Sequence, residues 1–110
     1  MLRIPVNLPP VPQNISVTAK NSTYVTVEWL PVSRHFVSNY HYNYTLSWLA
    51  VKGGSPGVIT NVTINVTSFE IRGLTPYTKH VIQVAARDWN GTGRFSNPLR
   101  VHTLEDGKLN

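Results

Sequence analysis

Apolar side chains recur at every second position in seven short runs of this chain, and this two-residue period restricts the fold more than any other feature. In a β-strand successive side chains point to opposite faces of the sheet, so each run has one face to bury. No window spaces its apolar residues as a helix would. We therefore expect an all-β domain with strands over the runs 15–19, 25–29, 44–48, 61–66, 69–72, 82–87 and 99–101.

Turn-forming residues separate these runs. Gly, Asn and Pro gather at 20–22, 53–57, 73 and 90–93. Short alternating strands with such punctuation are typical of a seven-stranded antiparallel sandwich of the immunoglobulin-like architecture. A chain of 110 residues forms one domain, and because it has no cysteine its hydrophobic core has to be sufficient without disulfides.

An ordered set of motifs resembles the fibronectin type III domain: Pro12, Trp29 followed by Pro31, the run 44–48, Gly73-Leu74-Thr75-Pro76-Tyr77-Thr78, Val84-Ala85-Ala86, and then Gly91, Gly93, Ser96 and Pro98. The resemblance covers residues 10–104, which leaves 1–9 as a linker and 105–110 as a linker or tail. It implies a core built without a disulfide. We assign nine residues to that core: Trp29, Tyr44, Leu46, Trp48, Leu74, Pro76, His80, Ile82 and Val84.

His80 departs from the family pattern. The resemblance implies a tyrosine four residues after Pro76, with a hydroxyl that bonds back to the turn. An imidazole can also donate one hydrogen bond, so we expect His80 to replace this corner with some loss of packing area. A pH-sensing role is the alternative.

Six Asn-x-Ser/Thr triplets occur, where chance placement of ten Asn and nineteen Ser/Thr predicts only about two. Such triplets are acceptors for N-linked glycans, so we expect the extracellular portion of a single-pass cell-surface protein, or a secreted one. Asn61 and Asn65 are expected to point outward on one strand face. The six acceptors are Asn14, Asn21, Asn43, Asn61, Asn65 and Asn90.

The chain has ten Lys and Arg against five Asp and Glu, but the cations are scattered singly. Scattered charge is typical of a solvated surface, with binding to heparan sulfate or matrix as an alternative and no nucleic-acid partner expected. Residues 1–10 lack the apolar core of a secretory signal, and no stretch reaches the ~18 apolar residues of a membrane span. We therefore expect a piece of a longer precursor, itself not inserted in a membrane.

Catalytic motifs are weak. The run Gly53-Gly54-Ser55-Pro56-Gly57 matches the G-x-S-x-G nucleophile elbow, but the residue after the serine is a proline without the N–H that an oxyanion hole needs. His35 and His41 share one loop, yet neither is paired with Cys or Asp at metal spacing. We expect no enzyme activity, cofactor or metal in this domain, while a catalytic domain elsewhere in the parent protein stays open.

Two segments, 30–43 and 89–94, have the composition of a contact surface, because aromatic residues and Arg dominate binding hot spots. In the expected sandwich they meet at one end. The alternative for Phe36 and Tyr40 is that they fold inward over the core. The candidate contact residues are Arg34, His35, Phe36, Tyr40, Tyr42, Trp89 and Arg94.

The resemblance implies tandem modules in receptor-type tyrosine phosphatases and adhesion receptors. Three functions stay open at this point. The domain recognises an extracellular protein, acts as a spacer docked to neighbouring domains of its own chain, or binds heparan sulfate.

Overall fold

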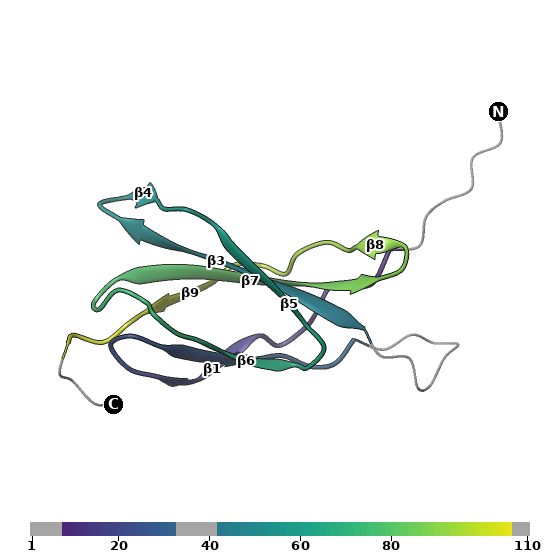
Figure 1. Cartoon of the computed structure of the whole chain (residues 1–110), viewed down its shortest axis with the longest axis horizontal. Coiled ribbons are helices and arrows are strands. Elements are labelled where there is room, and N and C mark those ends of the chain that lie inside the picture. The colour runs from purple at the N-terminus through teal and green to yellow at the C-terminus, as the bar shows by residue number, and fades with distance from the viewer. Residues whose placement is uncertain (1–7, 33–41, 107–110) are drawn as a thin grey trace.

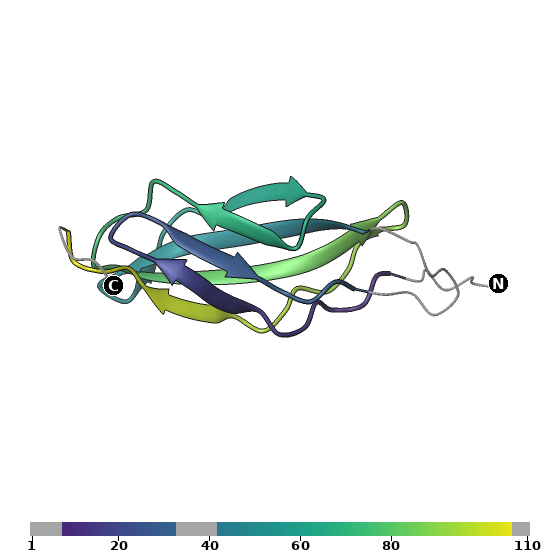
Figure 2. The same ribbon diagram turned by 90° about the horizontal axis from the view of Figure 1, so that it is seen from below.

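Two antiparallel sheets face each other in the computed structural model, which describes residues 8–32 and 42–106 (Figures 1 and 2). The smaller sheet has the order β1-β2-β6. Its strands are β1 (Ser16–Lys20), β2 (Val25–Glu28) and β6 (Ser68–Ile71). The all-β sandwich predicted from the alternation is confirmed.

The larger sheet is built around two ten-residue strands, β3 (Asn43–Lys52) and β7 (Lys79–Asp88), which pair along nearly their whole length. Beside β3 lie β4 and β5, and beside β7 lie β8 and β9. These flanking strands are β4 (Ser55–Pro56), β5 (Thr60–Ile64), β8 (Gly91–Thr92) and β9 (Leu99–His102).

Nine strands occur among the described residues, and two of them, β4 and β8, have only two residues each. The remaining seven fall on the seven predicted runs. One run is shorter than expected, because β5 ends at Ile64 and Asn65 lies in the bend that follows. Asn65 is exposed, but it does not share a strand face with Asn61 as predicted, since the alternation stops before it.

The core fills the space between the sheets with the alternate residues of β2, β3 and β7. Val25, Val27, Leu46, Ile82 and Val84 are completely buried. Around them, the predicted core residues Trp29, Tyr44 and His80 are almost fully buried, and Trp48, Leu74 and Pro76 are partly buried.

Tyr44 ties the end of the segment 8–32 to β3. Its ring meets Trp29 edge to face at 5.5 Å, and its hydroxyl accepts a hydrogen bond of 2.9 Å from the Val32 N–H.

His80 takes the buried corner position, but the hydrogen bond expected of it is absent. Neither ring nitrogen has a partner among the described residues, and the contact with the Thr75 backbone lies outside hydrogen-bond geometry. The hydroxyl of Thr103 closes the turn in its place, because it donates to the Thr75 carbonyl at 2.7 Å and accepts from the Thr78 N–H at 2.9 Å. The sequence reasoning placed the ring correctly and missed Thr103, which lies far from the turn along the chain.

The described chain begins beside β8 and ends at the opposite end of the sandwich (Figure 1). Pro9 is buried, and its carbonyl oxygen lies so close to Gly93 that a Cβ there would clash with it. Leu8 lies 3.6 Å from the position of a Cβ on Gly91. The last residues of the predicted linker thus pack on the β7–β8 hairpin.

Candidate functional site

The tip of the β7–β8 hairpin carries the most exposed aromatic side chain of the described residues. Trp89 is 80% exposed, although an indole would gain free energy from burial. The turn beneath it is well defined, since the Asp88 carboxylate accepts a 2.8 Å hydrogen bond from the Asn90 N–H. Gly91 follows with φ of 131°, which side chains other than glycine rarely adopt. The hairpin therefore presents its indole to solvent on a defined backbone.

Arg94 and Phe95 follow the hairpin and are both exposed. They line a hollow of about 470 Å³ between the segments 11–15 and 94–99. Ser96 holds the second segment to β7, because its N–H donates to the Val84 carbonyl at 2.8 Å and its hydroxyl accepts from the Val84 N–H at 3.1 Å. Trp89 and Arg94 thus lie at the same end of the sandwich, at the two ends of one short connection.

Of the predicted contact residues in the segment 30–43, the structure describes only Tyr42. Arg34, His35, Phe36 and Tyr40 lie outside the described residues. Tyr42 lies in the core at 3% exposure, so its assignment to the contact surface is wrong. The prediction failed because the sequence does not distinguish an aromatic residue that packs in the core from one that contacts a partner.

Four of the six glycan acceptors are exposed: Asn14, Asn43, Asn61 and Asn65. Asn90, next to Trp89, is partly buried. Three acceptors belong to the Trp89 end, because Asn43 pairs with Arg87 near the end of β7, and Asn65 directly follows the residue that pairs with Tyr44. Glycans at these positions would surround the candidate contact residues.

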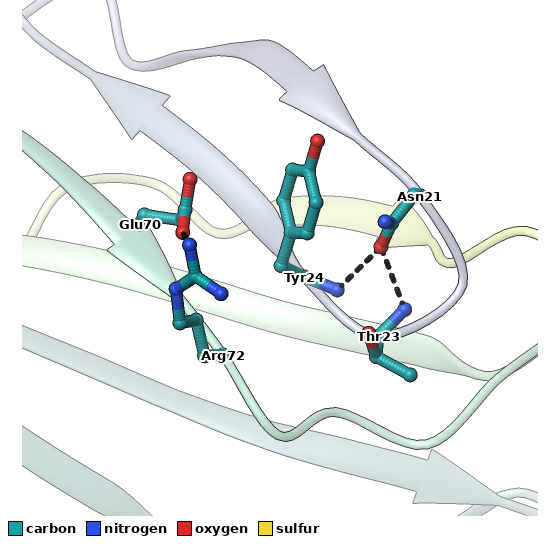
Figure 3. Close-up of polar contacts among 5 residues, drawn as sticks. All are labelled: Asn21, Thr23, Tyr24, Glu70 and Arg72. Atoms are coloured by element: carbon teal, nitrogen blue, oxygen red, sulfur yellow. Dashed lines mark hydrogen bonds and ion pairs between the residues drawn. The ribbon is translucent and has the colours of Figure 1, made fainter. Parts of the chain in front are cut away.

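Asn21 has a structural role in the β1–β2 turn. Its side-chain oxygen accepts hydrogen bonds from the N–H groups of Thr23 at 2.9 Å and Tyr24 at 3.0 Å (Figure 3). A glycan is attached through the amide nitrogen, so this acceptor role is compatible with modification.

Figure 3 also shows the ion pair of Arg72 with Glu70, beside the Tyr24 ring. This pair is at the surface, where such pairs contribute little to stability.

The residues of 8–32 and 42–106 bring together no group of three or more His, Asp or Glu that could hold a metal ion. Within the same ranges no helix is long and apolar enough to cross a membrane. The G-x-S-x-G match is the hairpin between β3 and β4, where Lys52 pairs with Ser55, and not a strand-to-helix turn. His35 and His41 lie outside the described residues.

The chain belongs to the fibronectin type III domain family, whose sequence model matches residues 10–102. It is 36% identical to protein sidekick-1 of Gallus gallus over 100 residues and 32% identical to receptor-type tyrosine-protein phosphatase S of the same species over 101 residues. It is 28% identical to the human cell adhesion molecule DSCAM over 96 residues. These alignments cover 86%, 89% and 86% of this chain but only 4%, 6% and 5% of the respective relatives.

Among solved structures, the FN5 domain of Drosophila Lar superimposes with a TM-score of 0.71 at 28% identity. The match covers 88% of this chain and 98% of that domain. The relatives are receptors and adhesion proteins, and the chain spans about one module of each.

Proposed function

We propose that this domain is a non-catalytic, extracellular recognition module of a cell-surface receptor or adhesion protein. Two of the relatives carry the words receptor-type and cell adhesion in their names, which supports this class. The six glycan acceptors support the extracellular compartment.

The observation that carries the proposal is the 80% exposure of Trp89 on a defined hairpin. Trp, Tyr and Arg are the residues that most often dominate protein interfaces, and Trp in particular buries a large area with few rotatable bonds. Arg94 adds an exposed guanidinium at the same end. The partner we propose is a folded extracellular protein that buries the Trp89 indole.

The position of the segment that leads into the domain favours a second candidate function, contact with a neighbouring domain. Leu8 and Pro9 pack against Gly91 and Gly93, so the segment that leads into the domain lies beside the Trp89 hairpin. In a tandem array, a preceding domain would stand over the same surface and bury the same indole. The domain would then act as a spacer with a fixed joint.

Binding to an array of purified ectodomains from cell-surface proteins tests the first candidate, with the domain secreted from eukaryotic cells and tetramerised as the probe. Trp89→Ser should abolish the specific signal, while Ile59→Ser, which removes another exposed apolar side chain of 58% exposure, should keep it. A signal that survives Trp89→Ser would exclude this surface.

Peptide mass spectrometry of the same secreted protein shows which acceptors are occupied. A bare Asn90 is expected for a recognition surface. A fully occupied Asn90, together with no ectodomain bound, would favour the spacer.

A further inference from the structure

Most strands at the sheet edges carry a feature that prevents another chain from pairing with them. A free edge has unpaired backbone N–H and C=O groups, and proteins protect it with charges, proline, bulges or very short strands. β1 has a bulge between Val17 and Ala19, β4 ends with Pro56, and β8 has only two residues. β6 includes Glu70, and β9 includes Arg100. These edges are therefore protected against strand addition.

β5 is the exception among the edge strands of the segments 8–32 and 42–106. It pairs with β3 on one side, and no strand of these segments pairs with its other side. It has no bulge, because its pairing with β3 runs without a register shift. No charged residue and no proline occurs between Pro56 and Glu70. β5 thus lacks the features that protect the other edges.

The segment around β5 has the composition of a strand that pairs readily. Val, Ile and Thr make up most of 58–64, and these residue types favour strands. Just before the strand Val58 is 88% exposed and Ile59 is 58% exposed, and just after it Val66 is 53% exposed. Uncharged segments with high β-propensity and no proline pair with further copies where they are accessible.

A second copy of this chain fits the β5 edge in the antiparallel direction. Val62 lies at the centre of β5, and Val58 and Val66 are each four residues from it. A two-fold axis beside Val62 would place Val58 of each copy toward Val66 of the other, so that the exposed valines cover one another. The same register would set Asn61 of each copy opposite Thr63 of the other. The edge is therefore self-complementary.

The glycan acceptor Asn61 lies on this edge. Val62 and Ile64 pack against the core, so the alternate side chains of Asn61 and Thr63 point to the outer face of the larger sheet. Asn61 is exposed, and the residue opposite to it on β3 is the small Ser47. A bulky glycan on Asn61 would occupy the space that the side chains of an incoming strand need.

We propose that the N-linked glycan of Asn61 protects the β5 edge and prevents the domain from pairing with a second copy through this strand. A glycan on the exposed Asn65, just beyond the strand, would add to this protection. The proposal rests on the extracellular compartment proposed above, because N-linked glycans are carried by secreted and cell-surface proteins. It requires no contact at Trp89.

Analytical ultracentrifugation of the domain secreted from eukaryotic cells tests the proposal, together with peptide mass spectrometry of Asn61. The glycosylated wild type should be a monomer up to about 1 mM, the upper end of the range in which unpaired strand edges associate. Asn61→Gln with Asn65→Gln should double the mass of the protein part, because this variant lacks both glycans and gains no charge. A double variant that stays monomeric would overturn the proposal.

The matched variant is Asn61→Lys with Asn65→Gln, which also lacks both glycans but places a charge on the edge. It should stay monomeric, because two-fold pairing would bring the two introduced ammonium groups close together. Equal dimerisation of the two double variants would locate the contact elsewhere and overturn the role of β5.

Ser16→Ala is the control for the loss of a glycan as such, because it removes the Asn14 acceptor site beside the smaller sheet. It should stay monomeric, and a dimer would overturn the assignment to β5. Trp89→Ser added to Asn61→Gln with Asn65→Gln should leave the dimer intact. Loss of the dimer would mean that the copies meet at the Trp89 end and would also overturn the proposal.

Glycan occupancy separates this proposal from the proposed function. A bare Asn61 in a monomeric wild type whose other acceptors are occupied would overturn the edge protection alone. Bare acceptors throughout the chain would overturn it together with the extracellular compartment.

Discussion

The two ends of the sandwich differ in where they place their polar and aromatic groups. At the end where β7 begins, Thr103 and His80 lie inside, nearly without solvent exposure, and Thr103 ties the turn together by hydrogen bonds. At the end where β7 finishes, Trp89 projects into solvent and the close contact of Pro9 with Gly93 holds the chain's first described segment. Stability of the first end therefore depends on side chains, and that of the second on a glycine.

The largest effect is expected from Thr103→Val, which keeps the shape and removes the hydroxyl. It leaves the Thr78 N–H and the Thr75 carbonyl without this partner, and should lower the free energy of unfolding by about 2–3 kcal/mol. Urea unfolding measures it. Thr18→Val is the control, because that exposed hydroxyl makes only a 3.4 Å bond to the Thr26 carbonyl. Equal losses would show that Thr103 does not hold the turn.

Gly93→Ala tests the other end. The new Cβ would meet the Pro9 carbonyl oxygen, and the displacement should cost about 1–3 kcal/mol of unfolding free energy. The same substitution in a chain without residues 1–9 should cost much less, because the clash is gone. A loss that is equal in both backgrounds would place its cause elsewhere in the hairpin.

His80 should make the first end sensitive to acid. Burial lowers its pKa below 6.5 in the folded state, partly offset by the Thr75 contact and reinforced by His102 and Lys52. Below about pH 6.5 this histidine takes up a proton in the unfolded chain, whereas in the folded domain it stays neutral until the pH reaches its lower folded-state pKa. The stabilisation is thus complete above that pH and is lost as the pH falls through the folded-state pKa.

Urea unfolding at about pH 7.5 and about pH 5 measures this loss in the wild type and in His80→Tyr. The variant should lose less stability on acidification. It should also melt no lower at neutral pH, because a hollow of about 150 Å³ lies beside His80 and gives room for the larger ring. His102→Gln is the exposed control. An unchanged pH dependence in His80→Tyr would exclude His80 as its source.

The smallest effect on stability is expected from Trp89→Ser. With 80% of the residue exposed, the substitution should change the unfolding free energy by less than about 0.5 kcal/mol while it removes the proposed contact. Thermal unfolding of the variant beside the wild type checks this. A large drop in melting temperature would show that the indole stabilises the domain and would weaken the case for a recognition surface.

Sequence reasoning located the strands because a sandwich buries one face of each of them, and this leaves a two-residue period in the chain. It failed where the pattern has two meanings. Tyr42 has the aromatic character of a contact residue, yet it lies in the core. Asn65 continues the alternation of β5, yet the strand has already ended at Ile64.

By itself the sequence determined the fold class, the family and the positions of the strands along the chain, because local alternation, turn residues and family motifs carry that information. Only the tertiary structure decided which groups meet. Thr103 closes a turn that begins at Thr75, and Lys52, Tyr77 and His102 line one hollow although they come from separate segments of the chain. Such contacts depend on how the strands pair, which no local pattern specifies.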